Sequence, residues 1–223
     1  MKYALILSLL IIAAPVPAFS HGGSNGSNYI LLTGFGPFDG YAVNPSEMVV
    51  EEMNGSTVDG AMVITIVLPV DFNQSAEKIR KAIEKYEPVA VICMGLDGYA
   101  RKIEVEKVAL NIKSMYLGDK FLGWRRIERG APLFMFSTLP VEKIVESIEE
   151  NGTDARISYF AGTYSCNYVF YSTLLYMEEN GKSTPAGFIH LPPLKSQKSY
   201  GMELEEMVKG IKIAMHETMK EVY

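Results

Sequence analysis

Residues 62–94 read MVITIVLPVDFNQSAEKIRKAIEKYEPVAVICM and decide the fold class. Residues 62–69 are rich in β-branched side chains, which favour a strand. In residues 75–86, apolar side chains recur at helical spacing among charged ones, which predicts an amphipathic helix. Residues 89–94 are an apolar run of strand length and predict a fully buried strand. A strand, a helix and a strand in succession are typical of a parallel sheet.

The same alternation continues on both sides of this stretch. Residues 29–33 predict a short strand that ends at Gly34, and Asn44-Pro45-Ser46-Glu47 predicts a capped helix that stops near Gly55. The later predictions are helix 140–150, strand 156–159, helix 166–177, strand 186–190 and helix 204–222. This order predicts an α/β fold, a single-domain three-layer α/β/α sandwich with a largely parallel twisted sheet. Sites in such folds gather at the carboxyl ends of the strands.

The composition fits one globular domain. The chain has 223 residues, 48% of them hydrophobic, and a formal net charge of −5, which suits one well-buried domain and not two large ones. Charges of both signs are mixed without a basic stripe, so nucleic acid is not an expected partner. Neither cysteine has the paired spacing of a zinc site, and no metal is expected.

The N-terminal residues are predicted to be a signal peptide. A lysine precedes an apolar run, and Ala18 and Ser20 are the small residues that a cleavage site requires. We expect a signal peptide at 1–20, a flexible Gly/Ser/Asn linker at 21–28 and the folded domain at 29–223. Cleavage would make the protein exported, either secreted or periplasmic. An uncleaved N-terminal anchor is the alternative.

Two residues are candidates for chemistry. Cys166 lies in AGTYSCNY (residues 161–168), a glycine-containing turn that enters a helix, and His190 ends a buried strand in GFIHLP (residues 187–192). A thiol at a helix N-terminus gains acidity, and a nearby imidazole favours the thiolate further. If both side chains meet at one edge of the sheet, the chain is a cysteine hydrolase. The plainer alternative is an inert core cysteine and a structural histidine.

The other cysteine, Cys93, lies inside the predicted strand 89–94 and is expected to be a small core residue. A Cys93–Cys166 disulfide is the alternative in an exported protein. Because that bond would consume the proposed nucleophile, we expect the two thiols to stay free.

Four separated segments carry a set of motifs. They are LTGFGPFDG with NP shortly after (residues 32–45), GLDG running on to IEVEKVALN (residues 95–111), the run around Cys166 and the run around His190, which follows Cys166 by 24 residues. The runs LPV (residues 68–70) and STLP (residues 137–140) support them. Together the segments resemble the pyroglutamyl-peptidase I (pyrrolidone-carboxylate peptidase) family of cysteine peptidases. The resemblance covers nearly all of residues 29–191.

The resemblance implies a role for each matching residue. Cys166 is the nucleophile, His190 the general base and acid, and Glu106 the carboxylate that orients and charges the imidazole. The residues implied to bind the pyroglutamyl ring are Phe35, Phe38, Leu96, Tyr164 and Asn44. Without the resemblance, Glu106 reads as part of a solvated strand face, Phe35 and Phe38 as core packing, and Asn44 as a helix cap. The family further implies peptides with N-terminal pyroglutamate as substrates, no cofactor or metal, and a homo-oligomer.

The chain departs from the family pattern at several places. Glu104 stands where the family usually has Ser or Thr, and Leu96 replaces a residue that is often Gln. After Asn111 the family usually carries an arginine and then Asp-Asn-Glu-Gly, whereas this chain has KSMYLGD (residues 113–119). This change puts the substrate preference in doubt. The family is also generally cytoplasmic, so a signal peptide on this chain is unusual.

Two rival functions stay open at this point. The same triad could hydrolyse another blocked N-terminal amide, because the segment after Asn111 is altered. Alternatively, the chain could be an exported, catalytically inactive homologue that binds lactams or peptides, with Cys166 locked to Cys93.

Overall fold

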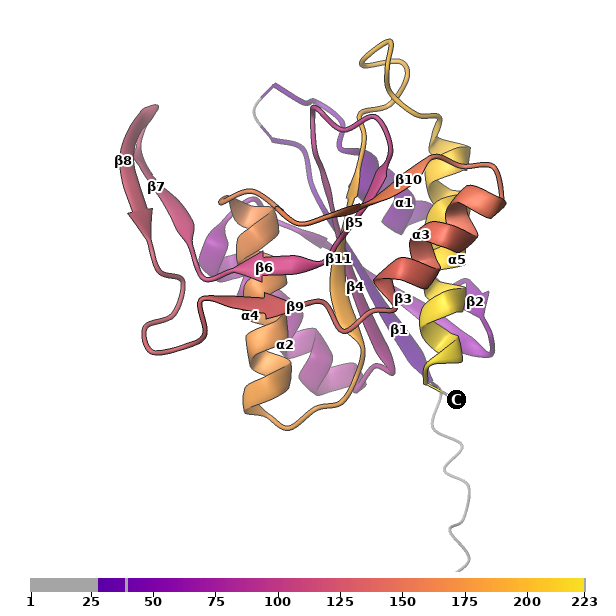
Figure 1. Cartoon of the computed structure of the whole chain (residues 1–223), viewed down its shortest axis with the longest axis horizontal. Helices are drawn as coiled ribbons and strands as arrows, with labels where there is room; N and C mark the ends of the chain where they lie inside the picture. Colours follow the sequence, from indigo (N-terminus) through magenta and orange to yellow (C-terminus); the bar gives the residue numbers. More distant parts are fainter. Residues whose placement is uncertain (1–27, 39, 223) are drawn as a thin grey trace, which may run out of the picture.

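A seven-stranded sheet forms the centre of the molecule in the computed structural model, which describes residues 28–38 and 40–222 (Figure 1). The predicted signal peptide and residues 21–27 of the predicted linker lie outside the described residues. The strands are β1 (Tyr29–Phe35), β2 (Thr57–Val58), β3 (Ala61–Leu68), β4 (Ala90–Leu96), β5 (Ile103–Glu106), β10 (Ala155–Ser158) and β11 (Ala186–Leu191). Their order across the sheet is β10-β5-β11-β4-β1-β3-β2.

Helices cover both faces of this sheet (Figure 1). On one face lie α1 (Pro45–Met53), α3 (Val141–Glu150) and α5 (Leu204–Lys220), and on the other lie α2 (Phe72–Tyr86) and α4 (Ser165–Glu179). Each face has its own apolar core, and alternate residues of the strands point into one core or the other. The prediction of a three-layer α/β/α sandwich is confirmed. Within the described ranges, no helix combines the length and the apolar character needed to cross a membrane.

The sheet is largely parallel, as predicted. Strands β1, β3, β4 and β11 run parallel to one another, and β10 is parallel to β5. The β5 strand was not among the predicted elements, and it runs antiparallel to β11. In this register Glu104 lies opposite His190, and Glu106 lies opposite Phe188. Because directly opposed residues share a face, all four side chains point towards α2 and α4.

The helix and strand boundaries follow the predicted ones closely. Gly34 does not end β1, because it pairs with Val67 of β3 and the strand continues to Phe35. Helix α2 begins three residues before the predicted start, because Asp71 caps it by accepting a hydrogen bond from the backbone N–H of Gln74 at 2.8 Å.

Four short strands after β5 build two small sheets. They are β6 (Val108–Leu110), β7 (Lys113–Leu117), β8 (Lys120–Arg125) and β9 (Phe134–Phe136). Strand β6 pairs with β9, and β7 pairs with β8 to form a hairpin. Figure 1 shows this hairpin projecting from the body of the molecule, beyond α4. The hairpin contains residues 113–119, where the chain departs from the family pattern.

Close packing of α1 against β1 fixes the first loop. A methyl group added at Gly34 would lie 2.2 Å from the carbonyl oxygen of Ser46, so only glycine allows this approach. Asn44 caps α1 as predicted, because its Oδ1 accepts from the backbone N–H of Ser46 at 3.1 Å. Its Nδ2 donates to the carbonyl of Gly36 at 3.1 Å. The loop between β1 and α1 is therefore held from both ends.

Candidate active site

The three residues predicted to be catalytic lie together on the α4 side of the sheet. Cys166 is the second residue of α4, His190 is the next-to-last residue of β11, and Glu106 is the last residue of β5. The His190 ring lies close enough to the Cys166 side chain for the two groups to interact electrostatically. On its other side, Nδ1 of His190 donates to Oε1 of Glu106 at 2.7 Å. One imidazole thus connects the thiol to a carboxylate.

Burial and charge act in opposite directions on His190, which is only 5% exposed. Burial lowers the pKa of the imidazole, but the charge and hydrogen bond of Cys166, and then those of Glu106, raise it. The raising effects win, so the pKa of His190 lies well above its ordinary value of 6.5. The arrangement therefore favours the charged form of the His190 imidazole.

Glu106 is fully buried, and only its Oε1 oxygen has a partner. Among the residues that the structure describes, Oε2 has no hydrogen-bond partner. The imidazole of His190 is therefore the hydrogen-bond partner of this carboxylate among the described residues. This environment excludes the alternative that Glu106 belongs to a solvated strand face.

Gly95 makes room for the nucleophile, and the sequence analysis did not single it out as a site residue. It pairs with His190 across β4 and β11. A methyl group added at Gly95 would lie 2.7 Å from Sγ of Cys166 and 3.0 Å from Cζ of Phe188. The available sequence signal was a glycine near the end of a buried strand, because a glycine there allows another group to approach the backbone closely.

The start of α4 presents free backbone N–H groups beside the thiol. Tyr164 is the N-cap residue, and its side chain makes no capping hydrogen bond. The first N–H groups of a helix have no partner within the helix, and the helix dipole favours negative charge there. These groups can stabilise a thiolate at Cys166 and an oxyanion next to it.

Asn167, the residue after the nucleophile, ties α4 to the strand that continues from Glu106. Its Oδ1 accepts from the N–H of Leu110, and its Nδ2 donates to the carbonyls of Leu110 and Ile112, all at 2.8–2.9 Å. Asn167 is fully buried, so these three bonds are its complete polar environment. The sequence analysis missed this residue, since a lone Asn in a helix start carries no distinct pattern.

The residues predicted to bind the pyroglutamyl ring have different environments. Phe35 is 2% exposed and packs into the core between the sheet and α4, whereas Phe38 is half-buried in the first loop. Leu96 is buried at the end of β4, directly after Gly95. Asn44 is fully buried, and its side chain is bonded within the loop. For these four residues, contact with a substrate stays a prediction.

Tyr41 brings the first loop against the loop that follows β4. Its ring lies 5.3 Å from that of Phe38, and its hydroxyl oxygen would be 2.3 Å from a methyl group at Gly98. Gly98 also accepts a hydrogen bond from the Tyr200 hydroxyl through its carbonyl at 2.8 Å. Phe38 and the end of β4 therefore belong to one packed unit, although they are distant in sequence.

Tyr164, the fifth of the predicted ring-binding residues, is half-exposed and stacks on Tyr116 of β7 with ring centroids 5.3 Å apart. Partial burial and the hydrogen bond with Tyr116 raise the pKa of Tyr164 to about 12. Its phenol is therefore neutral at any pH at which the protein would work.

A second carboxylate lies on the same face of β5. Glu104 is 3% exposed, and its Oε1 accepts from Nε of Arg156 at 2.9 Å. Burial raises the pKa of Glu104, and the hydrogen bond and charge of Arg156 oppose that rise. This buried carboxylate is therefore paired with Arg156 and takes no part in the contact between His190 and Glu106.

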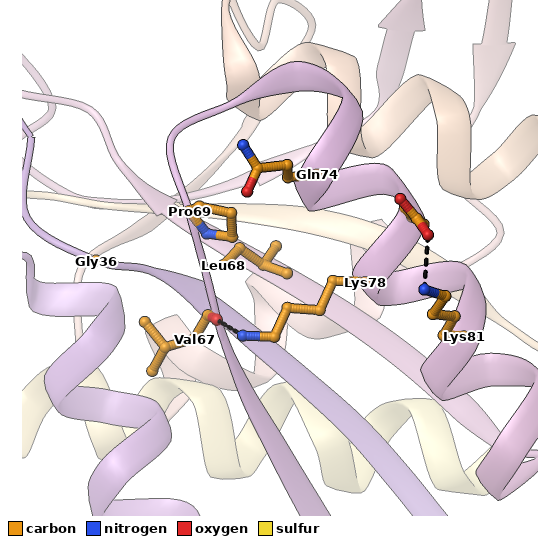
Figure 2. A pocket seen from close by; sticks show the side chains of 8 residues that line it. Gly36, Val67, Leu68, Pro69, Gln74, Lys78 and Lys81 are labelled. Atoms are coloured by element: carbon orange, nitrogen blue, oxygen red, sulfur yellow. Dashed lines mark hydrogen bonds and ion pairs between the residues drawn. The ribbon is translucent and has the colours of Figure 1, made fainter.

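A surface pocket of about 530 Å³ lies between the end of β3 and α2 (Figure 2). Its lining includes Gly36 from the first loop. Figure 2 shows Lys78 donating to the carbonyl of Val67, and Lys81 paired with a carboxylate, which belongs to Glu77. No catalytic candidate lines this pocket, and both of its lysines are engaged, so it lies apart from the chemistry.

Both cysteines are free thiols, and Cys93 is fully buried in β4 as predicted. Burial raises the pKa of Cys93 to about 11, against a weaker lowering by the neighbouring Thr33 and Thr173. In the described part of the chain, no three His, Cys, Asp or Glu residues are grouped so as to hold a metal ion.

Comparisons with known proteins agree with this geometry. A family model described as pyroglutamyl peptidase matches residues 28–221. A pyrrolidone-carboxylate peptidase of Coprothermobacter proteolyticus is 42% identical over 195 residues, which are 83% of this chain and 94% of that protein. The pyrrolidone carboxyl peptidase structure from Thermococcus litoralis is 33% identical with a TM-score of 0.82, covering 86% of this chain and 94% of the other. The pyroglutamyl peptidase I structure from Bacillus amyloliquefaciens is also 33% identical, with a TM-score of 0.81 and coverage of 86% and 95%.

Proposed function

This chain belongs to the pyroglutamyl peptidase family, and we propose that it hydrolyses the amide bond after an N-terminal pyroglutamyl residue with Cys166, His190 and Glu106 as catalytic residues. Family membership makes it a peptidase of the pyroglutamyl-peptidase I type. One observation carries the assignment of roles: a single buried imidazole is hydrogen-bonded to Glu106 through Nδ1 and interacts with the side chain of Cys166. A nucleophile, a base and an orienting group in that order are the requirement for acyl transfer.

The first half of the reaction forms a thioester. The Cys166 thiolate attacks the carbonyl carbon of the pyroglutamyl residue, a C–S bond forms, and the carbonyl oxygen becomes an oxyanion. Backbone N–H groups at the start of α4 stabilise that charge. The intermediate collapses by breaking the C–N bond, and the leaving amine takes a proton from the His190 imidazolium.

The second half releases the acid. The neutral imidazole of His190 takes a proton from water, which attacks the thioester carbonyl. The C–S bond then breaks, so pyroglutamic acid leaves, and the thiolate and imidazolium are restored. Glu106 holds Nδ1–H throughout, so Nε2 of the ring faces the sulfur. The cycle balances without a cofactor or a metal.

Recognition of the acyl group depends on shape and on one amide pair. Pyroglutamate is a neutral lactam without an α-amine, so an ion pair cannot select it, and apolar walls with an N–H/C=O pair are needed. Phe35, Phe38 and Tyr164 supply the aromatic surfaces in this proposal, and the backbone at Leu96 pairs with the lactam. Asn44 holds the loop that carries the two phenylalanines.

The test is an assay for release of a chromogenic amine from a pyroglutamyl amide, with and without a thiol-alkylating agent. We expect activity in the untreated protein and its loss on alkylation, in Cys166→Ser and in His190→Ala. Full activity in either variant would contradict the assigned roles. Turnover of a different blocked amide alone would favour the rival hydrolase, and lactam binding without turnover would favour the inactive homologue.

We also propose export, on the strength of the N-terminal sequence pattern alone. The N-terminal sequence of the protein isolated from its native cells tests this. We expect a mature chain that begins after residue 20, and a chain that keeps residues 1–20 would contradict the proposal of export by a cleaved signal peptide.

A further inference from the structure

Four aromatic rings form a row that starts beside the nucleophile. Tyr164, two residues before Cys166, stacks on Tyr116. Phe121 lies opposite Tyr116 on β8, and Trp124 packs on Phe121 and lies opposite Ser114, nearer the base of the hairpin. The centroid distances between successive rings are 5.3, 5.4 and 5.2 Å, so the rings form one continuous surface beside the nucleophile turn. We call these four residues the aromatic row.

The row faces the α4 side of the hairpin. Tyr116 pairs with Phe121, and Ser114 pairs with Trp124, so these side chains share one face of β7 and β8. Ser114 on that face is buried, and its hydroxyl is 2.6 Å from that of Thr163, in the loop before the nucleophile. The backbone N–H of Ser114 also donates to the carbonyl of Thr163 at 2.8 Å. The hairpin is therefore tied to the nucleophile turn at the point where the row begins.

The base of the hairpin is held as well. The Asn111 side chain is buried, its Oδ1 accepts from the N–H of Glu128 at 2.9 Å, and its Nδ2 donates to the carbonyl of Glu128 at 2.8 Å. These bonds join the residue that precedes the hairpin to the segment that follows it. A side chain on a hairpin held in this way is positioned before any ligand arrives, which lowers the conformational-entropy cost of binding.

The members of the row remain exposed despite their mutual contacts. Tyr116 is 41% exposed, Phe121 44%, Tyr164 53% and Trp124 63%. Exposed aromatic side chains that adjoin one another mark an interaction surface. A row that begins at a reactive turn has the substrate as its nearest partner.

The position of pyroglutamate limits which part of the substrate the hairpin rings can meet. Pyroglutamate is the first residue of its peptide, so nothing precedes it and the rest of the substrate follows the scissile bond. Tyr164 at the turn is assigned to the pyroglutamyl ring, which leaves the three rings on the hairpin for the residues after that bond.

The charge of the hairpin region also favours a pyroglutamyl peptide as the bound ligand. Residues 113–129 contain five basic and two acidic side chains, in a chain whose net charge is −5. A short pyroglutamyl peptide lacks the N-terminal ammonium but keeps its C-terminal carboxylate, which is ionised at neutral pH. Lys120 and Arg125 flank Phe121 and Trp124 in sequence and are exposed, so they can attract that carboxylate.

We propose that the three rings of the aromatic row on the hairpin, Tyr116, Phe121 and Trp124, form a leaving-side subsite, which favours pyroglutamyl peptides whose second and third residues are apolar or aromatic and whose C-terminal carboxylate is free. This inference rests on the proposed function and adds the substrate class. It also assigns a role to the hairpin of β7 and β8.

The experiment compares kcat/KM for two substrates, pyroglutamyl-alanine amide and pyroglutamyl-phenylalanyl-leucine with a free carboxylate. We expect the unaltered protein to prefer the longer peptide by about tenfold, the effect of one to two aromatic contacts. Phe121→Ala/Trp124→Ala should lower this ratio several-fold, leaving only the preference for the free carboxylate. Phe134→Ala is the matched control, because Phe134 is 52% exposed on β9 and outside the row, and it should keep the ratio.

A second variant separates charge from stacking. Lys120→Glu/Arg125→Glu should abolish any preference for the free carboxylate over the amide of the same longer peptide, while the aromatic preference stays. This variant also carries the test if the double alanine variant fails to fold.

Each remaining outcome is decisive. An equal kcat/KM for both substrates in the unaltered protein, or an unchanged ratio in both double variants, overturns the subsite. An unchanged ratio together with loss of a dimer in size-exclusion chromatography assigns the row to a second copy of the chain, and this also overturns the subsite. Cleavage of neither substrate overturns the proposed function, and the subsite with it.

Discussion

Gly95 shows how much of the site depends on one missing side chain. A methyl group there would lie 2.7 Å from Sγ of Cys166, so Gly95→Ala must displace the thiol. We expect kcat/KM to fall by about 100-fold, since a displacement of about 1 Å at a reacting atom has that effect. A steady-state assay on the variant, with thermal unfolding to verify the fold, checks this. Gly36→Ala is the stability control, because the nearest atom to its methyl group would be 3.7 Å away, and near-normal activity in Gly95→Ala would contradict the geometry.

The His190–Glu106 contact predicts a pH dependence. The folded-state pKa of His190 lies above the ordinary value, so its charged form stabilises the fold below about pH 6.5, and this contribution is lost as pH rises through the folded-state pKa. The His190 imidazolium should likewise persist well above pH 6.5. Glu106→Gln removes a negative charge beside the ring and therefore lowers that pKa. We expect the alkaline limb of the kcat/KM profile to move to lower pH and the maximum to fall by at least about 100-fold.

The control for this pH profile is Glu84→Gln, which alters an exposed carboxylate on α2. It should leave both limbs in place. An alkaline limb that stays unmoved in Glu106→Gln would show that Glu106 does not charge the imidazole.

At the scale of elements, the side chain of Asn167 connects α4 to β6 by hydrogen bonds. Asn167→Ala removes the side-chain partner of the Leu110 N–H and of the Ile112 carbonyl in a buried place, whereas the Leu110 carbonyl still accepts from the N–H of Ile112. We expect the free energy of unfolding to fall by about 2–4 kcal/mol. Chemical denaturation measures it. Asn180→Ala is the matched control at the C-terminal end of the same helix, because the exposed Asn180 side chain bonds only to the carbonyl of Tyr176. This variant should lower the free energy of unfolding by less than about 1 kcal/mol. Equal losses in both variants would contradict the role of Asn167.

The regular elements could be predicted because each has a strong local pattern. Residues 75–86 have helical apolar spacing and residues 89–94 form an unbroken apolar run, and both elements were found within a few residues of the predicted ends. The strands β5 to β9 could not be predicted, because they are only three to six residues long and several are exposed on both faces. Short strands owe their conformation to the strand they pair with, which local sequence does not reveal.

The site could be predicted only in part for the same reason. Cys166 and His190 follow from a helix start and a strand end, but Glu106 came from the resemblance alone. Its burial depends on the antiparallel pairing of β5 with β11, two strands that are about 80 residues apart in the chain. Gly95 matters only because α4 delivers a sulfur atom beside it. Cross-strand register and helix placement are properties of the assembled sheet.

For the whole molecule, the fold separates the two thiols by depth. Cys93 is fully buried with a pKa of about 11, whereas Cys166 is partly exposed at the edge of the sheet. A thiol reagent at pH 7–8 should therefore react rapidly with one thiol in the native protein and with two after unfolding in guanidinium chloride. The Cys166→Ser variant should have no rapidly reacting thiol in the native protein and one after unfolding. Two rapid thiols in the native protein would contradict the burial of Cys93, and none in the native or unfolded protein under non-reducing conditions would indicate a disulfide.

Strand β11 occupies the position between β4 and β5 and is the last strand of the chain to be made. A nascent polypeptide that still holds residue 191 inside the ribosome has two unjoined half-sheets and no imidazole beside its thiol. The thiol therefore has no catalytic base until residues 186–191 have left the ribosome and β11 has joined the sheet.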